Sequence, residues 1–283
     1  MWGHTYMRIR ATVAAVSGAL ALSALAVPAA QADDKPDHRV SPFAANAPQD
    51  EIEGDIKITK VVVNGGKNIV VGTTAAKTFK IAITATDPSG IEGGDQFLWH
   101  GSAFNENDID GALLSEQEEA DCVKASATTS TCTVSVTVDP QLDLYKNALA
   151  GTWKVWASVY AGDGDYVFKE IAGTARVQRY AKLTANASPE PVVKGKTITI
   201  TGKLSRANWE TSAYAGYTKQ PVKLQFRKAG TSTYTTVKTV TSSSTGSLKT
   251  TVTAASDGYW RYSFAGTSTT PAVSAAGDYL DVR

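Results

Sequence analysis

Short segments of alternating apolar and polar residues, separated by turn-forming residues, recur along this chain. Residues 222–227 read Val-Lys-Leu-Gln-Phe-Arg, so apolar and polar side chains fall on opposite faces of an extended strand. Residues 197–201, 248–252, 260–264 and 280–282 alternate in the same way. No 3.6-residue period accompanies them. The pattern therefore predicts an antiparallel sandwich in the C-terminal half of the chain.

The N-terminal half alternates less regularly. Residues 60–63 and 69–71 flank the turn Asn-Gly-Gly-Lys and predict a hairpin, because Asn and Gly tolerate positive φ. Residues 105–121 interrupt the pattern and could form a short helix or a long acidic loop. The alternating segments of this half predict seven interior residues: Phe79, Ile81, Ile83, Val134, Val136, Trp153 and Val155.

Residues 1–32 have the three-part pattern of a cleaved signal peptide. Arg8 and Arg10 precede the uncharged run 11–27, and Ala30-Gln31-Ala32 supplies the small-x-small cleavage motif. A membrane-spanning helix, the alternative, needs about 20 apolar residues. We expect cleavage after Ala32 and secretion of a soluble, extracellular protein.

The remaining length is more than one typical domain requires. Residues 33–53 contain three prolines and few apolar residues, which predicts a flexible leader. We expect one domain over residues 54–179 and a second over 180–283, because one strand pattern ends near Tyr180 and residues 187–191 begin another. The closely spaced prolines of 187–191 predict a short, stiff junction.

Charge differs between the two expected domains. Residues 33–179 contain 22 acidic and 13 basic side chains, and residues 180–283 contain 5 and 13. Because these charges nearly cancel, we expect neither a nucleic acid nor a membrane as partner. The halves could attract one another, or they could be two solvated surfaces of unrelated bias, since salt screens exposed charges beyond about 8 Å.

Several strand and turn motifs resemble those of bacterial immunoglobulin-like repeats. In the first half these are residues 87–91, 150–155 and 163–165; residues 191–202, 220–224 and 257–261 resemble a second such domain. Tandem domains of this kind are common in secreted actinobacterial proteins, in families of unassigned function. The resemblance implies an all-β fold of two tandem antiparallel immunoglobulin-like β-sandwiches. It implies no activity, because one fold hosts many functions.

Cys122 and Cys132 are the chain's two cysteines. An even number in an exported protein favours a disulfide bond. Only nine residues separate them, too few for a bridge between distant strands. We therefore expect the bond to close a local hairpin around residues 126–130.

Residues suited to catalysis are scarce. After signal cleavage only His38 and His100 remain as histidines, and no glycine-rich phosphate loop occurs. We interpret His100 as a sheet or loop residue that hydrogen-bonds to its surroundings. The sequence thus favours a protein that is not an enzyme, with a small extracellular hydrolase built on paired carboxylates as an alternative.

The sequence predicts no cofactor, and calcium bound by one of two groups of aspartates is the alternative. Asp108 and Asp110 follow the alternate spacing of a calcium loop, although Gln117 replaces the bidentate Glu of such loops and favours a solvated acidic loop. The second group lies in loops at strand ends and could surround one ion or simply form turns. It comprises Asp87, Asp163 and Asp165.

Three aromatic residues lie in a segment rich in turn formers, residues 208–219. Trp209, Tyr214 and Tyr217 could form an exposed row that stacks on sugar rings. Alternatively, Trp209 covers the open end of the sandwich core.

The sequence therefore predicts a secreted, non-catalytic protein that acts in adhesion, scaffolding or recognition. Its partner would be a cell-wall polysaccharide or another extracellular protein. Carbohydrate or cell-wall binding through the aromatic loop is the alternative binding function.

Overall fold

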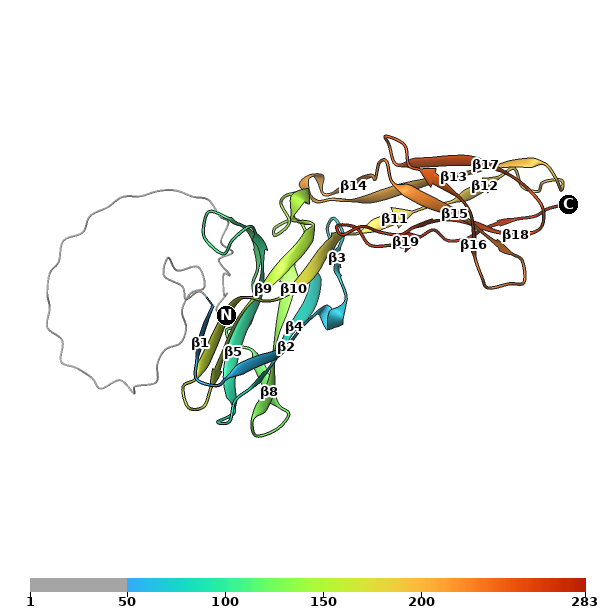
Figure 1. The fold of residues 1–283 in the computed structure, drawn as a ribbon. Helices are drawn as coiled ribbons and strands as arrows, with labels where there is room; N and C mark the ends of the chain where they lie inside the picture. Colours follow the sequence, from blue (N-terminus) through green and yellow to red (C-terminus); the bar gives the residue numbers. More distant parts are fainter. Residues whose placement is uncertain (1–49) are drawn as a thin grey trace, which may run out of the picture. The chain divides into compact units, whose positions relative to one another are not determined.

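Strands make up nearly all the regular structure in the computed structural model, which describes residues 50–283 (Figure 1). The predicted signal peptide, residues 1–32, and positions 33–49 of the predicted leader lie outside the described residues. The leader prediction is wrong at its end, because Glu51–Glu53 form strand β1, which pairs with β10 (Tyr166–Arg179).

Two sheets are formed by the chain as far as Arg179. One is six-stranded in the order β1-β10-β9-β5-β6, and β3 pairs with β10 as well. The other is four-stranded in the order β2-β4-β8-β7. Their further bounds are β2 Lys57–Val63, β3 Ile69–Val71, β4 Lys77–Thr86, β5 Ile91–Gly101, β6 Ile109–Leu113, β7 Asp121–Lys124, β8 Thr129–Val138 and β9 Gly151–Ala161.

The alternation of apolar and polar residues determines which side chains form the core of this first pair of sheets. In β8 every second residue is buried, and the buried ones face β5, β9 and β10 across the sandwich. All seven interior residues predicted for this half are buried, with at most 4% of their surface exposed. A helix in residues 105–121 is not formed, since β6 occupies the middle of that segment.

The hairpin predicted for residues 60–63 and 69–71 is wrong. β2 pairs with β4, whereas β3 pairs in parallel with β10 in the other sheet. The turn between them is a 3-10 turn, η1 (Asn64–Gly66), in which Gly65 and Gly66 have φ values of 62° and 79°. These glycines allow a tight turn, as predicted, but the turn moves the chain from one sheet to the other.

From Ala181 onward the strands form two five-stranded sheets. In one, β13 pairs with β11, β12, β14 and β17; in the other, the order is β16-β15-β18-β19, and β20 also pairs with β18. The bounds are β11 Ala181–Leu183, β12 Asn186–Ser188, β13 Thr197–Asn208, β14 Ala213–Gly216, β15 Pro221–Lys228, β16 Thr235–Thr241, β17 Ser247–Thr253, β18 Gly258–Phe264, β19 Val273–Ser274 and β20 Asp278–Leu280.

Alternating strands again supply the core of this second pair. Ile198 and Ile200 of β13 pack with Val222 and Leu224 of β15 and with Tyr262 of β18. The fold class is thus confirmed: the described residues are all-β, and the sheets, antiparallel except for the β3–β10 pair, pack as immunoglobulin-like sandwiches. Strand pairing changes from the first pair of sheets to the second at Tyr180. The prolines expected to stiffen the junction follow β12 instead, within the second pair.

Candidate functional site

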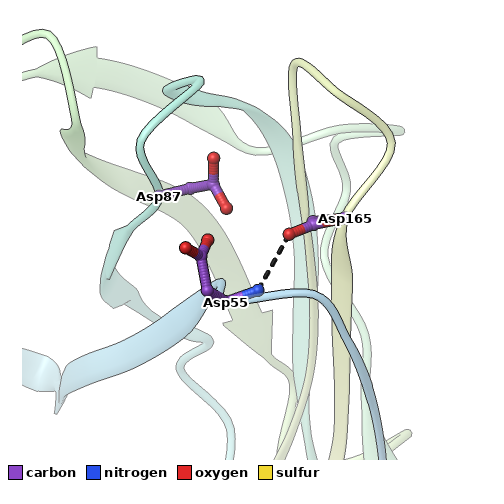
Figure 2. Close-up of side chains that lie close together, drawn as sticks. All are labelled: Asp55, Asp87 and Asp165. Carbon is purple, nitrogen blue, oxygen red and sulfur yellow. Dashed lines mark hydrogen bonds between the residues drawn. The ribbon is translucent and has the colours of Figure 1, made fainter.

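Three aspartates meet at one end of the first pair of sheets. Asp55 lies between β1 and β2, Asp87 directly follows β4, and Asp165 directly precedes β10. Each offers a carboxylate oxygen, and the three oxygens lie within 4.8 Å of one another. Figure 2 shows the three side chains pointing toward one another.

Strand register explains this convergence. Glu53 of β1 is opposite Tyr166 of β10 in the six-stranded sheet, and Lys57 of β2 is opposite Thr86 of β4 in the four-stranded sheet. The chain crosses from one sheet to the other between Glu53 and Lys57. Asp55 therefore lies where the end of β4 and the start of β10 come together.

The three carboxylates differ in their surroundings. Asp87 is 2% exposed, Asp165 is half-buried, and Asp55 is exposed. Asp87 Oδ1 accepts hydrogen bonds from the backbone N–H and the hydroxyl of Ser89, at 2.7 and 2.6 Å, whereas Asp87 Oδ2 is buried without a hydrogen-bond partner. Asp165 Oδ2 accepts the backbone N–H of Asp55 at 2.9 Å.

Like charges face one another in this group. Partial removal from water, followed by the negative charges of Asp87 and Asp165, raises the pKa of Asp55 above its ordinary value. Within the described part of the chain, no basic side chain forms an ion pair with any of the three carboxylates. The group is therefore an arrangement of oxygen ligands that lacks a cationic partner among residues 50–283.

The sequence anticipated two members of this group. Asp87 and Asp165 come together as one alternative proposed, but Asp163 does not join them; it is exposed, and its Oδ1 accepts the backbone N–H of Asp165 at 3.2 Å. Asp55 takes the third place. The only sequence signal for it is the turn-forming pair Gly54-Asp55 before an alternating segment, which does not indicate its neighbours.

The other predicted calcium group, Asp108 and Asp110, is divided between separate partners. Asp108 accepts hydrogen bonds from the hydroxyl of Ser102 at 2.7 Å and the amide of Asn105 at 2.8 Å, which lower its pKa. Asp110 pairs with Lys146 at 2.8 Å and with the ring of His100. Among residues 50–283, neither aspartate belongs to a group of three ligand-type side chains.

His100 lies in β5 and makes the kind of structural contact expected of it. Its Nδ1 contacts Asp110, and its ring centroid lies 5.4 Å from that of Trp153. Burial opposes ionisation of Asp110, but hydrogen bonds from Lys146 and His100 outweigh it and lower the pKa of Asp110. This group ties β5 and β6 to the segment before β9.

The exposed row of aromatic side chains, one of the two alternatives for residues 208–219, is not formed. Trp209 is 3% exposed and packs in the core of the first pair of sheets, although it follows β13 of the second pair. Tyr217 is 9% exposed and packs in the core of the second pair. Tyr214 is half-buried beneath the Lys182 ammonium, which lies 3.6 Å from its ring centroid. The alternative reading, in which Trp209 covers a core, is closer to the structure.

The predicted disulfide bond is confirmed. Cys122 of β7 and Cys132 of β8 are directly opposite in the antiparallel register and are joined through their sulfur atoms. The hairpin turns where expected, with the backbone N–H groups of Ala125 and Ser126 both donating to Thr129 O.

Comparisons with known proteins do not identify a function for this chain. Residues 69–160, from β3 into β9, match a family described as being of unknown function, DUF5707. No curated protein matches the chain. Among residues 50–283, no helix has the length and apolar character needed to cross a membrane.

Solved structures with similar chains contain immunoglobulin-like domains. The D00-D0 domain of intimin is 17% identical with a TM-score of 0.26, over 78% of this chain and 99% of that one. Titin domains Z1Z2 in complex with telethonin are 11% identical with a TM-score of 0.22, over 81% and 96%. The Yersinia pseudotuberculosis adhesin InvE is 12% identical with a TM-score of 0.25, over 78% and 58%. At such low identities and TM-scores, the functions of these proteins say nothing about this chain. The chain is similar, over residues 69–160, to a family of unknown function.

Proposed function

We propose that this protein is a secreted, non-catalytic scaffold that holds two immunoglobulin-like sandwiches in a fixed arrangement outside the cell. The observation that carries the proposal is the burial of Trp209, a residue of the second pair of sheets, in the core of the first. A flexible tether between domains would not require a shared core.

Polar contacts reinforce this junction. Asn147, which precedes β9, donates its side-chain amide to Asn208 at 2.7 Å and its backbone N–H to Glu210 at 2.9 Å. The backbone N–H of Tyr180 donates to Val71 O at 2.8 Å, and that of Ala207 donates to Tyr180 O at 2.8 Å. Movement of the sandwiches against one another would break these bonds together, and each is worth about 1 kcal/mol net.

An extracellular location is supported by the Cys122–Cys132 bond, because disulfides persist in oxidising compartments and are rare in the cytosol. The signal peptide predicted for residues 1–32 agrees with this location. Adhesion and recognition remain compatible uses of such a scaffold, with a wall polysaccharide or an extracellular protein as partner.

Spin-label distance measurement tests the fixed arrangement. Lys80 of β4 and Lys249 of β17 are exposed and can be replaced by labelled cysteines, while the native cysteines stay bonded to one another. We expect one narrow distance distribution in this labelled protein and a broad one after Trp209→Ala, in samples whose circular dichroism shows folded sheets. A broad distribution with Trp209 present would contradict the proposal.

Retention assays test the partner class. Residues 33–283 would be incubated with cellulose, chitin, peptidoglycan and whole cell walls, with the reduced and unfolded chain as control. A scaffold of the wall is expected to be retained on at least one of these materials in its folded form only. Equal retention of the unfolded chain would show that the binding is nonspecific and would count against a wall scaffold.

A further inference from the structure

The buried oxygen of Asp87 is the feature of the aspartate group that requires explanation. Asp87 is 2% exposed, and its Oδ2 atom has no hydrogen-bond partner. Burying a charged group without a partner is unfavourable, and most buried polar atoms in folded proteins are satisfied. In Figure 2 the Asp87 carboxylate is directed toward Asp55 and Asp165.

Turn formation explains the position of only one of the two carboxylate oxygens of Asp87. Its Oδ1 atom accepts both bonds from Ser89, the usual way in which an aspartate stabilises a turn. Oδ2 takes no part in the turn. A residue needed only as a turn former would not have to direct a second, buried oxygen at two other carboxylates.

Backbone geometry holds the remaining two carboxylates beside Asp87. Gly54 has φ of 79°, and a Cβ atom built on it would lie 1.6 Å from Asp165 Oδ2, so the absence of a side chain at position 54 makes room for Asp165. The next residue donates its N–H to the same oxygen. Asp165 is thus positioned by the crossing between β1 and β2.

The group is open to solvent on one side. A pocket of about 330 Å³ adjoins it, lined by Asp55, Lys57, Thr86, Asp87, Pro88 and Thr128. Water can reach the exposed Asp55 carboxylate from this side. An ion held by the three carboxylates could therefore complete its coordination with water molecules.

We propose that Asp55, Asp87 and Asp165 form a binding site for a divalent cation of the calcium class. Calcium binds six to eight oxygen ligands at about 2.3–2.6 Å, so ligands on opposite sides of one ion lie about 5 Å apart. The three oxygens, all within 4.8 Å of one another, fit this range. Magnesium requires a stricter octahedron with ligands at about 2.0–2.1 Å, and an open, partly exposed group suits it less.

Binding would join both sheets of the first sandwich at one end. Asp87 extends from the four-stranded sheet, Asp165 from the six-stranded sheet, and Asp55 from the segment that connects them. The ion would neutralise the mutual repulsion of the carboxylates and would stabilise the folded chain by mass action. Extracellular modules bind calcium with dissociation constants of about 10⁻⁴–10⁻³ M, and this site is expected to fall in that range.

Calorimetric titration of chelator-treated residues 33–283 with calcium chloride tests the site directly. We expect saturable binding of one ion, and a Tm higher by about 3 °C or more in about 10 mM calcium than in chelator. Magnesium chloride at the same ionic strength is expected to bind at least about tenfold more weakly.

Three substitutions test whether the ion binds at these carboxylates. Asp87→Asn keeps an oxygen for the Ser89 turn and removes the buried charge, and we expect it to weaken binding more than about tenfold. Asp55→Asn alters an exposed residue, so it tests the site even if the first variant folds poorly. The matched control is Asp163→Asn, which removes a charge from the same β9–β10 turn but none of the three oxygens; we expect at most about a threefold change.

Three results would overturn the assignment. One is the absence of both saturable calcium binding and a change in Tm. The second is unchanged calcium affinity in folded Asp87→Asn and Asp55→Asn. The third is equal affinity for calcium and magnesium.

Discussion

The indole N–H of Trp209 donates a hydrogen bond of 2.9 Å to the carbonyl oxygen of Gly72. Gly72 directly follows β3 in the first pair of sheets, and Trp209 follows β13 in the second. The indole ring packs with buried residues of the first pair, together with its neighbour Ala207. Trp209 and Ala207 therefore complete the core of the first pair of sheets, although β13 pairs with strands of the second pair.

Replacing this side chain should destabilise the protein strongly. For Trp209→Ala we expect a decrease of about 3–5 kcal/mol in the free energy of unfolding, because a large buried ring is lost and a cavity remains. Trp209→Phe retains much of the apolar volume but leaves Gly72 O without its donor, and should cost about 1–3 kcal/mol. Urea unfolding followed by circular dichroism measures both. A loss below about 1 kcal/mol for Trp209→Ala would show that the ring contributes little.

Reduction of the disulfide bond should have a moderate effect. Cys122 and Cys132 close a small loop, and the chain-entropy model gives about 2–3 kcal/mol for a loop of this size. We expect dithiothreitol to lower the free energy of unfolding by this amount in the native chain. The variant with both cysteines replaced by alanine is the control, since the reductant should not affect it. A native chain that is equally stable with and without reductant would contradict the prediction.

The raised pKa of Asp55 predicts a pH-dependent difference between the native chain and Asp55→Asn. Its folded-state pKa lies above the ordinary 3.8, because the carboxylate is partly removed from water and lies near the charges of Asp87 and Asp165. The folded state therefore favours the protonated form more than the unfolded state does. Its contribution to stability is present below pH 3.8 and is lost as the pH rises through the folded-state pKa.

In chelator, Asp55→Asn should therefore be more stable than the native chain near neutral pH, and the difference should vanish at low pH. Urea unfolding at several values between about pH 3 and about pH 7 measures this difference. Asp163→Asn, treated in the same way, reports the effect of removing a nearby charge outside the group. A difference that does not change with pH would contradict the raised pKa.

Alanine variants of two glycines with positive φ would distinguish the cost of backbone strain from the cost of steric overlap. At Gly54 an added Cβ atom would overlap Asp165, whereas at Gly164, with φ of 98°, it would meet no atom within 4 Å. Both alanine variants should lose about 1 kcal/mol or more through the unfavourable φ.

Gly54→Ala should lose more stability than Gly164→Ala, and only Gly54→Ala should displace Asp165 and weaken calcium binding. Chemical denaturation and calorimetric titration of the two variants make the comparison. Equal losses of stability and of affinity would mean that the approach of Asp165 to Gly54 has no consequence.

Local patterns in the sequence were sufficient for the strands that alternate clearly and for the core residues that these strands contribute. The period of two placed Phe79, Ile81 and Trp153 in the interior because a sheet with one buried face requires that period. The disulfide followed from the even number of cysteines in a chain expected to be exported, and the close spacing of Cys122 and Cys132 located it in a hairpin. Each of these inferences depends on neighbours in the sequence.

Features that depend on distant pairing were not predictable in the same way. Asp55 joins Asp87 and Asp165 only because four strands of two sheets end together, and no local motif records that register. The sequence allows Trp209 to be exposed in a loop or to cover the core of its own sandwich, whereas the core that buries it belongs to sheets that precede it in the chain. The prediction of a β2–β3 hairpin was wrong for a related reason, since a turn motif does not specify to which sheet the next strand belongs.

The position of Trp209 also decides where this protein can be divided. A recombinant fragment ending at Tyr180 would contain every strand of the first two sheets, but it would leave the Trp209 cavity empty and the Gly72 carbonyl without its donor. The family match over residues 69–160 omits β2 and β10, so it is shorter still than a complete sandwich. Sequence similarity and strand pairing thus each suggest a cut that the folded protein would not tolerate without loss. Recombinant work should retain the second pair of sheets as well, because β13, which carries the chain to Trp209, is itself paired with β17 and packed against β15 and β18.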